Sequence, residues 1–222
     1  TDFNINTGAK NDFIERIKYK SKMKESYIAA GVPVARHHIV STLAEARAFI
    51  KEVGYPVIVK PADSDAWARC RFPGKRKVYL AGDAAALCAV LDAVCRSSYC
   101  GAMLLQEYIP GPDTRLGVVN AYCAADGSVP WLVQGQPLLQ ERTPEGMGNY
   151  AAVLVEPTRQ DTALLNALRG LLQAAGWRGY ANFDLKYDRR GEPVLFELNP
   201  RQGRASYYCD AAGQSITIPG LD

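Results

Sequence analysis

The chain has few of the residues and patterns that identify redox, zinc or nucleic-acid sites. It contains two histidines, His37 and His38, which lie in a short strand-like stretch where a structural role is favoured over catalysis. Its six cysteines form no CxxC pair and no zinc-type spacing, so we expect free thiols; they are Cys70, Cys88, Cys95, Cys100, Cys123 and Cys209. A formal net charge of +3, without a clustered basic face, argues against nucleic acid as a partner.

Long apolar runs and a secretory leader are also lacking, so we expect no membrane association and a cytoplasmic enzyme or binding protein. With 222 residues, of which 48% are hydrophobic and 22% charged, the chain is long and apolar enough to bury a sizeable core. Cys88 and Cys95 are seven apart in a helix-like segment and are expected on its buried stripe.

Hydrophobic periodicity predicts alternating helices and strands. Capping residues and glycines set several boundaries, such as Thr42 or Ser41 before a helix and Gly54 after it. Expected helices cover 12–30, 43–53, 83–96 and a leucine-rich stretch around 164–172; expected strands cover 34–40, 56–60, 77–80 and 103–108, with strand-rich sequence over 115–155 and a loop over 61–74.

The stretch FDLKYDRRGEPVLFELNPRQGR, residues 183–204, is the most informative in the chain. Its centre, DRRG, is a polar turn between two runs that alternate as strands do, which predicts a β-hairpin. Glu197 and Asn199 leave the same face of the second strand because they are two residues apart, and Asp184 can lie opposite them.

Two carboxylates and an amide oxygen form the hard ligand set that magnesium prefers. Arg201 and Arg204 follow directly and indicate an anion site beside such a metal. The alternative is a polar hairpin whose acidic side chains simply face water.

Other residues point to a nucleotide. Lys60 closes an apolar strand, a position from which its ammonium can project into a cleft, although a solvated lysine is the alternative for it and for Lys20. The segment LLQEYIPGPD is predicted to be a strand that turns at Pro110, which leaves the backbone of Glu107 and Ile109 free to pair with a planar heterocycle. Asp113 then stands where a carboxylate could accept hydrogen bonds from sugar hydroxyls.

Taken together, these motifs resemble the ATP-grasp ligases over residues 20 to 208. The metal-type residues have the spacing of the D-alanine–D-alanine ligase branch, and ELNPRQGR resembles a motif of the carbamoyl phosphate synthetase large subunit. Overall, the stretch from FPGKRKVY to ELNPRQGRASYY looks most like D-aspartate ligase and similar carboxylate-amine ligases.

The resemblance implies an α+β fold with two subdomains and a nucleotide cleft between them. It implies ATP and one or two Mg²⁺ ions, or Mn²⁺, as cofactors, and small-molecule carboxylate and amine substrates that are joined through an acyl phosphate. Catalytic roles fall on Arg201 and Arg204. Metal binding falls on Asp184, Glu197 and Asn199; nucleotide binding falls on Lys20, Lys60, Lys75, Lys77, Gln106, Glu107, Tyr108, Ile109, Asp113 and Arg142.

The chain also departs from the family pattern. The expected lid loop over 61–74 contains one glycine, Gly74, so phosphate contacts are expected from Arg71, Lys75 or Lys77 side chains. Asn182 stands where the D-alanine ligase branch often has arginine, which argues against dipeptide ligation of that type.

We expect an entry segment over residues 1–32, a lid subdomain over 33–108 and a core subdomain over 109–222. An amino-terminal domain common in the family is expected to be absent from this chain. Residues 1–60 hold seven lysines and three arginines, whereas the rest hold three and thirteen. A lysine-rich exposed helix and a recombinant chimera both explain this shift in basic residues. The second hypothesis for function is a nucleotide-binding fragment or chimera without full catalysis. Carbamate chemistry is a third and weaker option.

Overall fold

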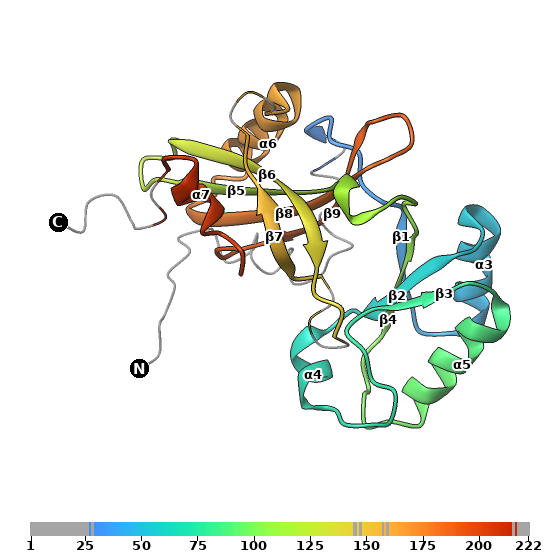
Figure 1. Cartoon of the computed structure of the whole chain (residues 1–222). Helices are drawn as coiled ribbons and strands as arrows, with labels where there is room; N and C mark the ends of the chain where they lie inside the picture. Colours follow the sequence, from blue (N-terminus) through green and yellow to red (C-terminus); the bar gives the residue numbers. More distant parts are fainter. Residues whose placement is uncertain are drawn as a thin grey trace.

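The computed structural model describes residues 27, 29–143, 146, 148–156, 158, 160–214 and 216. Two antiparallel sheets with helices packed against them form the fold (Figure 1). This is the α+β class that the sequence predicts. Most of the expected entry helix, together with Lys20, lies outside the described residues.

The first sheet has four strands in the order β1-β4-β2-β3. Helices α3 and α5 contact its strands, and the core between them includes Phe49, Val57 and Leu87. The strands are β1 (His37–Val40), β2 (Val57–Pro61), β3 (Tyr79–Ala81) and β4 (Met103–Glu107); the helices are α3 (Leu43–Val53), α4 (Ser64–Arg69) and α5 (Ala84–Cys95).

Helix α3 begins and ends where its capping residues predict. Thr42 Oγ1 accepts from the amide of Glu45 at 3.2 Å, and the Glu45 carboxylate accepts from the amide of Thr42 at 3.1 Å. These two bonds are a capping box, which satisfies amides that the first turn leaves open. Gly54 closes the helix with a φ of 73°, a conformation that side chains with a Cβ rarely adopt.

Helix α4 lies inside the stretch expected to be a loop. Asp63 Oδ1 caps it by accepting from the amides of Asp65 and Ala66 at 2.9 Å each. Trp67, 5% exposed, anchors it through edge-on contacts with Phe72 and Tyr99, whose ring centroids lie 5.4 and 4.9 Å away. Periodicity missed this helix because six residues are too short to show a repeat, and its anchor is a tertiary contact.

The expected burial of Cys88 and Cys95 was also wrong. Cys95 is exposed and Cys88 is half-buried. The buried residues of α5 are Leu87 and Val94, each one position before a cysteine. The buried face of the helix is therefore centred on Leu87 and Val94 and not on the cysteines.

The second sheet has five strands in the order β7-β6-β5-β8-β9, and β8 and β9 form the predicted hairpin. Helix α6 packs on one face with Val119 and Phe183, whereas α7 packs with Val118 and Val133, which point the other way. The elements are η2 (Asp113–Arg115), β5 (Leu116–Cys123), β6 (Trp131–Gln140), β7 (Tyr150–Leu154), α6 (Thr162–Ala174), β8 (Gly179–Tyr187), β9 (Pro193–Asn199) and α7 (Tyr208–Ala211).

The segment before β1 belongs to this second sheet. Val34 forms a parallel bridge with Leu195 of β9, and the Ala35 amide donates to the Leu195 carbonyl at 3.0 Å. The chain therefore leaves the five-stranded sheet at Ala35 and enters the four-stranded sheet at His37. The proposed subdomain limits, 33–108 and 109–222, remain predictions. Among the helices of the described residues, none is long and apolar enough to cross a membrane.

Leu168 tests the packing that supports the hairpin. It is fully buried between α6 and the sheet that carries β8 and β9. Leu168→Ala should lower the free energy of unfolding by about 2–5 kcal/mol because it removes buried methyl groups and leaves a cavity. Leu154→Ala, at a position 43% exposed, is the control and should cost less than about 1 kcal/mol. Urea denaturation measures both; equal losses would contradict this assignment of the core.

Candidate nucleotide and metal site

A cleft of about 1180 Å³ lies between the two sheets. Ile58 and Tyr79 contribute to its wall from the four-stranded sheet, and Val118 and Asp184 contribute from the five-stranded sheet. It is large enough for a nucleotide with room for a second small molecule.

Most of the predicted site residues line this one cleft, although they come from segments far apart in the sequence. Those that do are Lys60, Lys77, Gln106, Glu107, Tyr108, Ile109, Asp113, Arg142, Asp184, Glu197, Asn199, Arg201 and Arg204.

Lys75 is not among the lining residues, and its phosphate role stays a prediction. Its ammonium donates to the Cys70 carbonyl at 2.8 Å and lies 5.7 Å from the centroid of the Trp67 ring. Both contacts hold the segment after α4 in place. Lys77, two residues on, faces the cleft instead.

The predicted metal ligands lie together at the end of the β8–β9 hairpin. Asp184 pairs directly with Glu197 in the strand register, and Asn182 pairs with Asn199. Asn199 Nδ2 donates to Asp184 Oδ2 at 3.2 Å, which leaves the Asn199 oxygen as an acceptor for another partner. The two carboxylates and this amide oxygen are therefore held on one face by backbone pairing.

The electrostatics of this pair favour a bound cation. Burial, and after it the neighbouring negative charge of Glu197, raise the pKa of Asp184 from 3.8 to about 6. A hydrogen bond from the Tyr150 hydroxyl to Asp184 Oδ1, 2.9 Å long, acts in the opposite direction, as do the charges of Lys77 and Arg201. Two adjacent carboxylates held in this way fit Mg²⁺, which would remove their repulsion. Within the described ranges there is no group of three or more His, Cys, Asp or Glu arranged to hold a metal.

At the other end of the cleft, two residues predicted to bind nucleotide contact each other. Lys60 Nζ donates to Gln106 Oε1 at 2.7 Å, and Gln106 is 5% exposed. Asp113 accepts from the Gln140 side chain at 3.0 Å and from its amide at 3.3 Å. These bonds fix the orientation of the Asp113 carboxylate and still leave lone pairs for a further donor.

Lys186 is a cleft residue that sequence reasoning missed. It is 8% exposed, its ammonium donates to the Gly111 carbonyl at 2.6 Å, and it lies 5.6 Å from the centroid of the Tyr108 ring. Burial lowers its pKa, while the charge of Asp113 acts against that shift. The sequence does contain a signal for this position, because Asn182, Asp184 and Lys186 are two residues apart and therefore point to the same face of β8.

The arginines lie at the exposed edge of the cleft. Arg204 NH1 lies 4.0 Å from a carboxylate oxygen of Glu141, and Arg201 NH1 donates to the Gln202 carbonyl at 2.9 Å. The Arg204 side chain is 72% exposed, so its present ion pair contributes little and leaves it able to turn toward an anion.

Comparison with known proteins connects this geometry to one group of enzymes. Residues 15–77 match the family described as "Carbamoyl-phosphate synthase L chain, ATP binding domain". The chain is 33% identical to D-aspartate ligase of Enterococcus faecium over 76% of its own length and 38% of that protein. It is 28% identical to D-alanine–D-alanine ligase of Stutzerimonas stutzeri over 85% of its length and 56% of that protein.

A solved structure shows the same fold. The biotin carboxylase domain of 2-oxoglutarate carboxylase from Hydrogenobacter thermophilus, crystallised with MgADP, ADP and bicarbonate, superposes with a TM-score of 0.67 at 18% identity. The match covers 93% of this chain and 48% of that one. This chain therefore spans 38% to 56% of the length of these three proteins.

Asp184 generates a prediction about stability and pH. Because its folded pKa, about 6, lies above the ordinary value of 3.8, the ionised carboxylate destabilises the metal-free fold above pH 6, and this cost disappears as the pH falls toward 4. Asp184→Asn should therefore raise the melting temperature by a few degrees at pH 7.5 in EDTA, and by much less at pH 4.5.

Asp126→Asn is the matched control. Asp126 is exposed, and hydrogen bonds from Ser128 lower its pKa, so its replacement should give no gain at pH 7.5. Thermal denaturation at the two pH values measures both variants. An unchanged or lower melting temperature for Asp184→Asn at pH 7.5 would contradict the strain assigned to the carboxylate pair.

Proposed function

We propose that the chain contains an ATP-grasp domain and that its cleft binds ATP with Mg²⁺ as part of a carboxylate-amine ligase. The observation that carries the proposal is the pairing of Asp184 with Glu197, next to Asn199, in a cleft lined from both sheets. A carboxylate with a raised pKa beside a second carboxylate in the cleft suits a cation that accompanies phosphates.

In this proposal the nucleotide lies along the cleft. The base pairs with the backbone of Glu107 and Ile109 beside Gln106, and Asp113 accepts from the ribose hydroxyls. Lys60 and Lys77 lie against the phosphates as point charges, with Lys20 in the same role outside the described residues. Asp184, Glu197 and Asn199 would hold one or two Mg²⁺ ions, which when bound would offset negative charge on the phosphate oxygens.

The residues of this chain then favour phosphoryl transfer to a carboxylate. A carboxylate oxygen attacks the γ-phosphorus of ATP, the bond to the bridging oxygen breaks, and ADP leaves. Charge on the transferred oxygens is offset by guanidinium groups of Arg201, Arg204 and Arg142 from the cleft edge. An amine next attacks the carbonyl carbon of the acyl phosphate and expels inorganic phosphate, which completes the amide bond. Water must be excluded until then, and we expect the segment from α4 to Lys77, which lines the cleft with Ser64, Arg76 and Lys77, to cover the phosphates.

The likeness to D-aspartate ligase supports aspartate as the carboxylate substrate. Asn182 argues against ligation of the D-alanine–D-alanine type, because it places a neutral amide where that ligase branch often has arginine. The acceptor amine would be bound with the help of sequence outside the matched portion, since the chain covers 38% of that relative. A domain that binds nucleotide without turnover is the second candidate, and the short coverage is the observation that favours it.

Magnesium-dependent nucleotide binding tests the proposed site. Titration calorimetry with a non-hydrolysable ATP analogue should show binding that needs Mg²⁺ and weakens about ten- to a hundredfold in Glu197→Gln, because one metal ligand loses its charge. Glu192→Gln is the matched control; Glu192 lies in the exposed turn of the same hairpin and should bind as the wild type does. Equal affinity for the two variants would contradict the assigned metal site.

Isotope transfer tests the reaction itself. If the carboxylate of aspartate is labelled with ¹⁸O, one labelled oxygen should appear in inorganic phosphate, because the acyl phosphate loses that oxygen when the amine attacks. Mass spectrometry of the phosphate reads the outcome. If the chain binds nucleotide but forms no ADP from ATP with aspartate and any amine of a panel, the non-catalytic candidate is correct. ADP formation that leaves the phosphate unlabelled would contradict an acyl phosphate intermediate.

A further inference from the structure

Among the described residues the chain passes between the two sheets at two places, and these two places are in contact. The first is Arg36, between Ala35, which bonds to β9, and His37, which begins β1. The second follows Glu107, the last residue of β4, and leads through Tyr108 to η2. The amide of Glu107 donates to the carbonyl of Arg36 at 2.8 Å, so the two crossings are hydrogen-bonded through their backbones.

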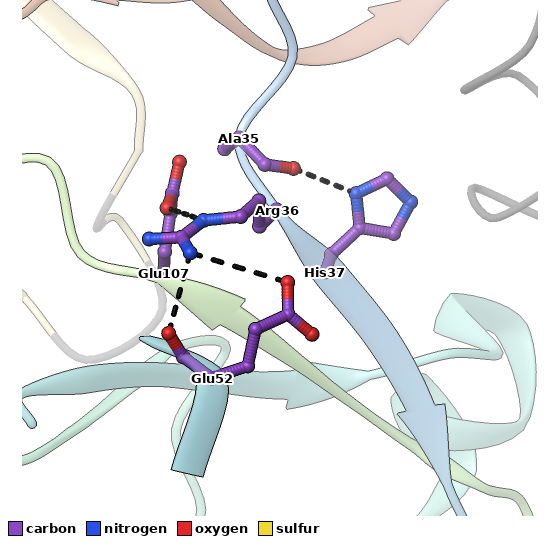
Figure 2. A network of polar contacts seen from close by, with 5 residues as sticks. All are labelled: Ala35, Arg36, His37, Glu52 and Glu107. Carbon is purple, nitrogen blue, oxygen red and sulfur yellow. Dashed lines mark hydrogen bonds and ion pairs between the residues drawn. The ribbon is translucent and has the colours of Figure 1, made fainter. Parts of the chain in front are cut away.

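The side chain of Arg36 adds a second layer of contacts at the same point (Figure 2). Its Nε lies 2.5 Å from Glu107 Oε2, and its NH1 donates to the backbone carbonyl of Glu52 at 3.3 Å, with the Glu52 carboxylate 3.9 Å away. Glu52 lies in the last turn of α3, where carbonyls lack helical partners and attract positive charge. One guanidinium therefore holds the crossing segment to both β4 and α3.

Arginine suits this position in a way that lysine does not. Its planar group offers donors in several fixed directions, and here they serve a carboxylate and a carbonyl on two different elements. The Glu107 side chain is 19% exposed, so its bond to Arg36 is better shielded than the ordinary surface pair of Arg96 and Asp92, whose side chains are 80% and 68% exposed.

The far end of the second crossing is held from the other sheet. Lys186 of β8 donates to the Gly111 carbonyl, and its ammonium lies over Tyr108. The segment from Glu107 to Gly111, which lines the cleft, is thus fixed at its start by Arg36 and near its end by Lys186.

We propose that Arg36 is a positioning residue for the base-binding end of the cleft: it fixes the backbone of Glu107 and the residues after it so that a nucleobase meets a preformed edge. The inference rests on the proposed nucleotide function, because it names what holds the segment that would pair with the base. Arg36 itself is not among the residues that line the cleft. Its effect is therefore on order and alignment, which lowers the entropy lost when the base binds.

The test separates the base end from the phosphate end. Calorimetry on Arg36→Gln should show a roughly tenfold weaker affinity for the Mg²⁺ complex of a non-hydrolysable ATP analogue. Its affinity for Mg²⁺ tripolyphosphate, which has no base, should change less than about twofold. Arg96→Gln is the matched control, since it removes an arginine and an ion pair away from the cleft, and should leave both affinities unchanged.

Two further variants test the same inference if Arg36→Gln folds poorly. Glu107→Gln removes the same ion pair from the other side and should weaken nucleotide in the same way, while Arg36→Lys should recover part of the loss because one of the contacts can reform. Equal nucleotide affinity in wild type and in both Gln variants would overturn the inference. So would a parallel loss of tripolyphosphate, which would indicate a general effect of charge. Failure of the wild-type chain to bind either ligand would overturn the proposed function itself.

Discussion

The antiparallel pairing of β8 with β9 is the interaction on which the candidate site depends. It sets Asp184 directly opposite Glu197 and brings Asn199 within hydrogen-bonding distance of Asp184. Backbone hydrogen bonds and the α6 core fix the two strands, so the backbone positions of Asp184 and Glu197 stay opposite each other. Burial and the charge of Glu197 raise the pKa of Asp184 as a result, and the fold carries a cost that a divalent cation would remove.

The two sheets contribute different residues to the cleft. The five-stranded sheet contributes Asp184, Glu197, Asn199 and the buried Lys186, whereas the four-stranded sheet contributes Lys60 and Gln106. Neither sheet forms the cleft alone. The alignment of base end and metal end therefore depends on how the chain crosses between the sheets, which is where Arg36 and Lys186 make their contacts. Nucleotide sites in proteins generally depend on such preformed polar edges, because ordering them at the moment of binding costs affinity.

Much of this site was predictable from the sequence because its signals are local. The spacing of Glu197 and Asn199 places them on one strand face, the polar turn before them sets the hairpin, and Thr42 with Gly54 sets the ends of α3. Predictions failed where the deciding contact is tertiary. Trp67 makes edge-on contacts with Phe72 and Tyr99, which stabilise α4 inside an expected loop. Strand alternation places Lys186 on the same face of β8 as Asp184, but its contact with the Gly111 carbonyl, 75 residues away, is tertiary and has no sign in the neighbouring sequence.

A crystal structure of this chain with Mn²⁺ and a non-hydrolysable ATP analogue would test the account most directly, since Mn²⁺ accepts the same oxygen ligands as Mg²⁺ and scatters anomalously. The account predicts an anomalous peak within coordination distance of Asp184 and Glu197, with the base against the backbone of Glu107 and Ile109. A peak elsewhere, or a nucleotide bound outside the cleft between the two sheets, would contradict it.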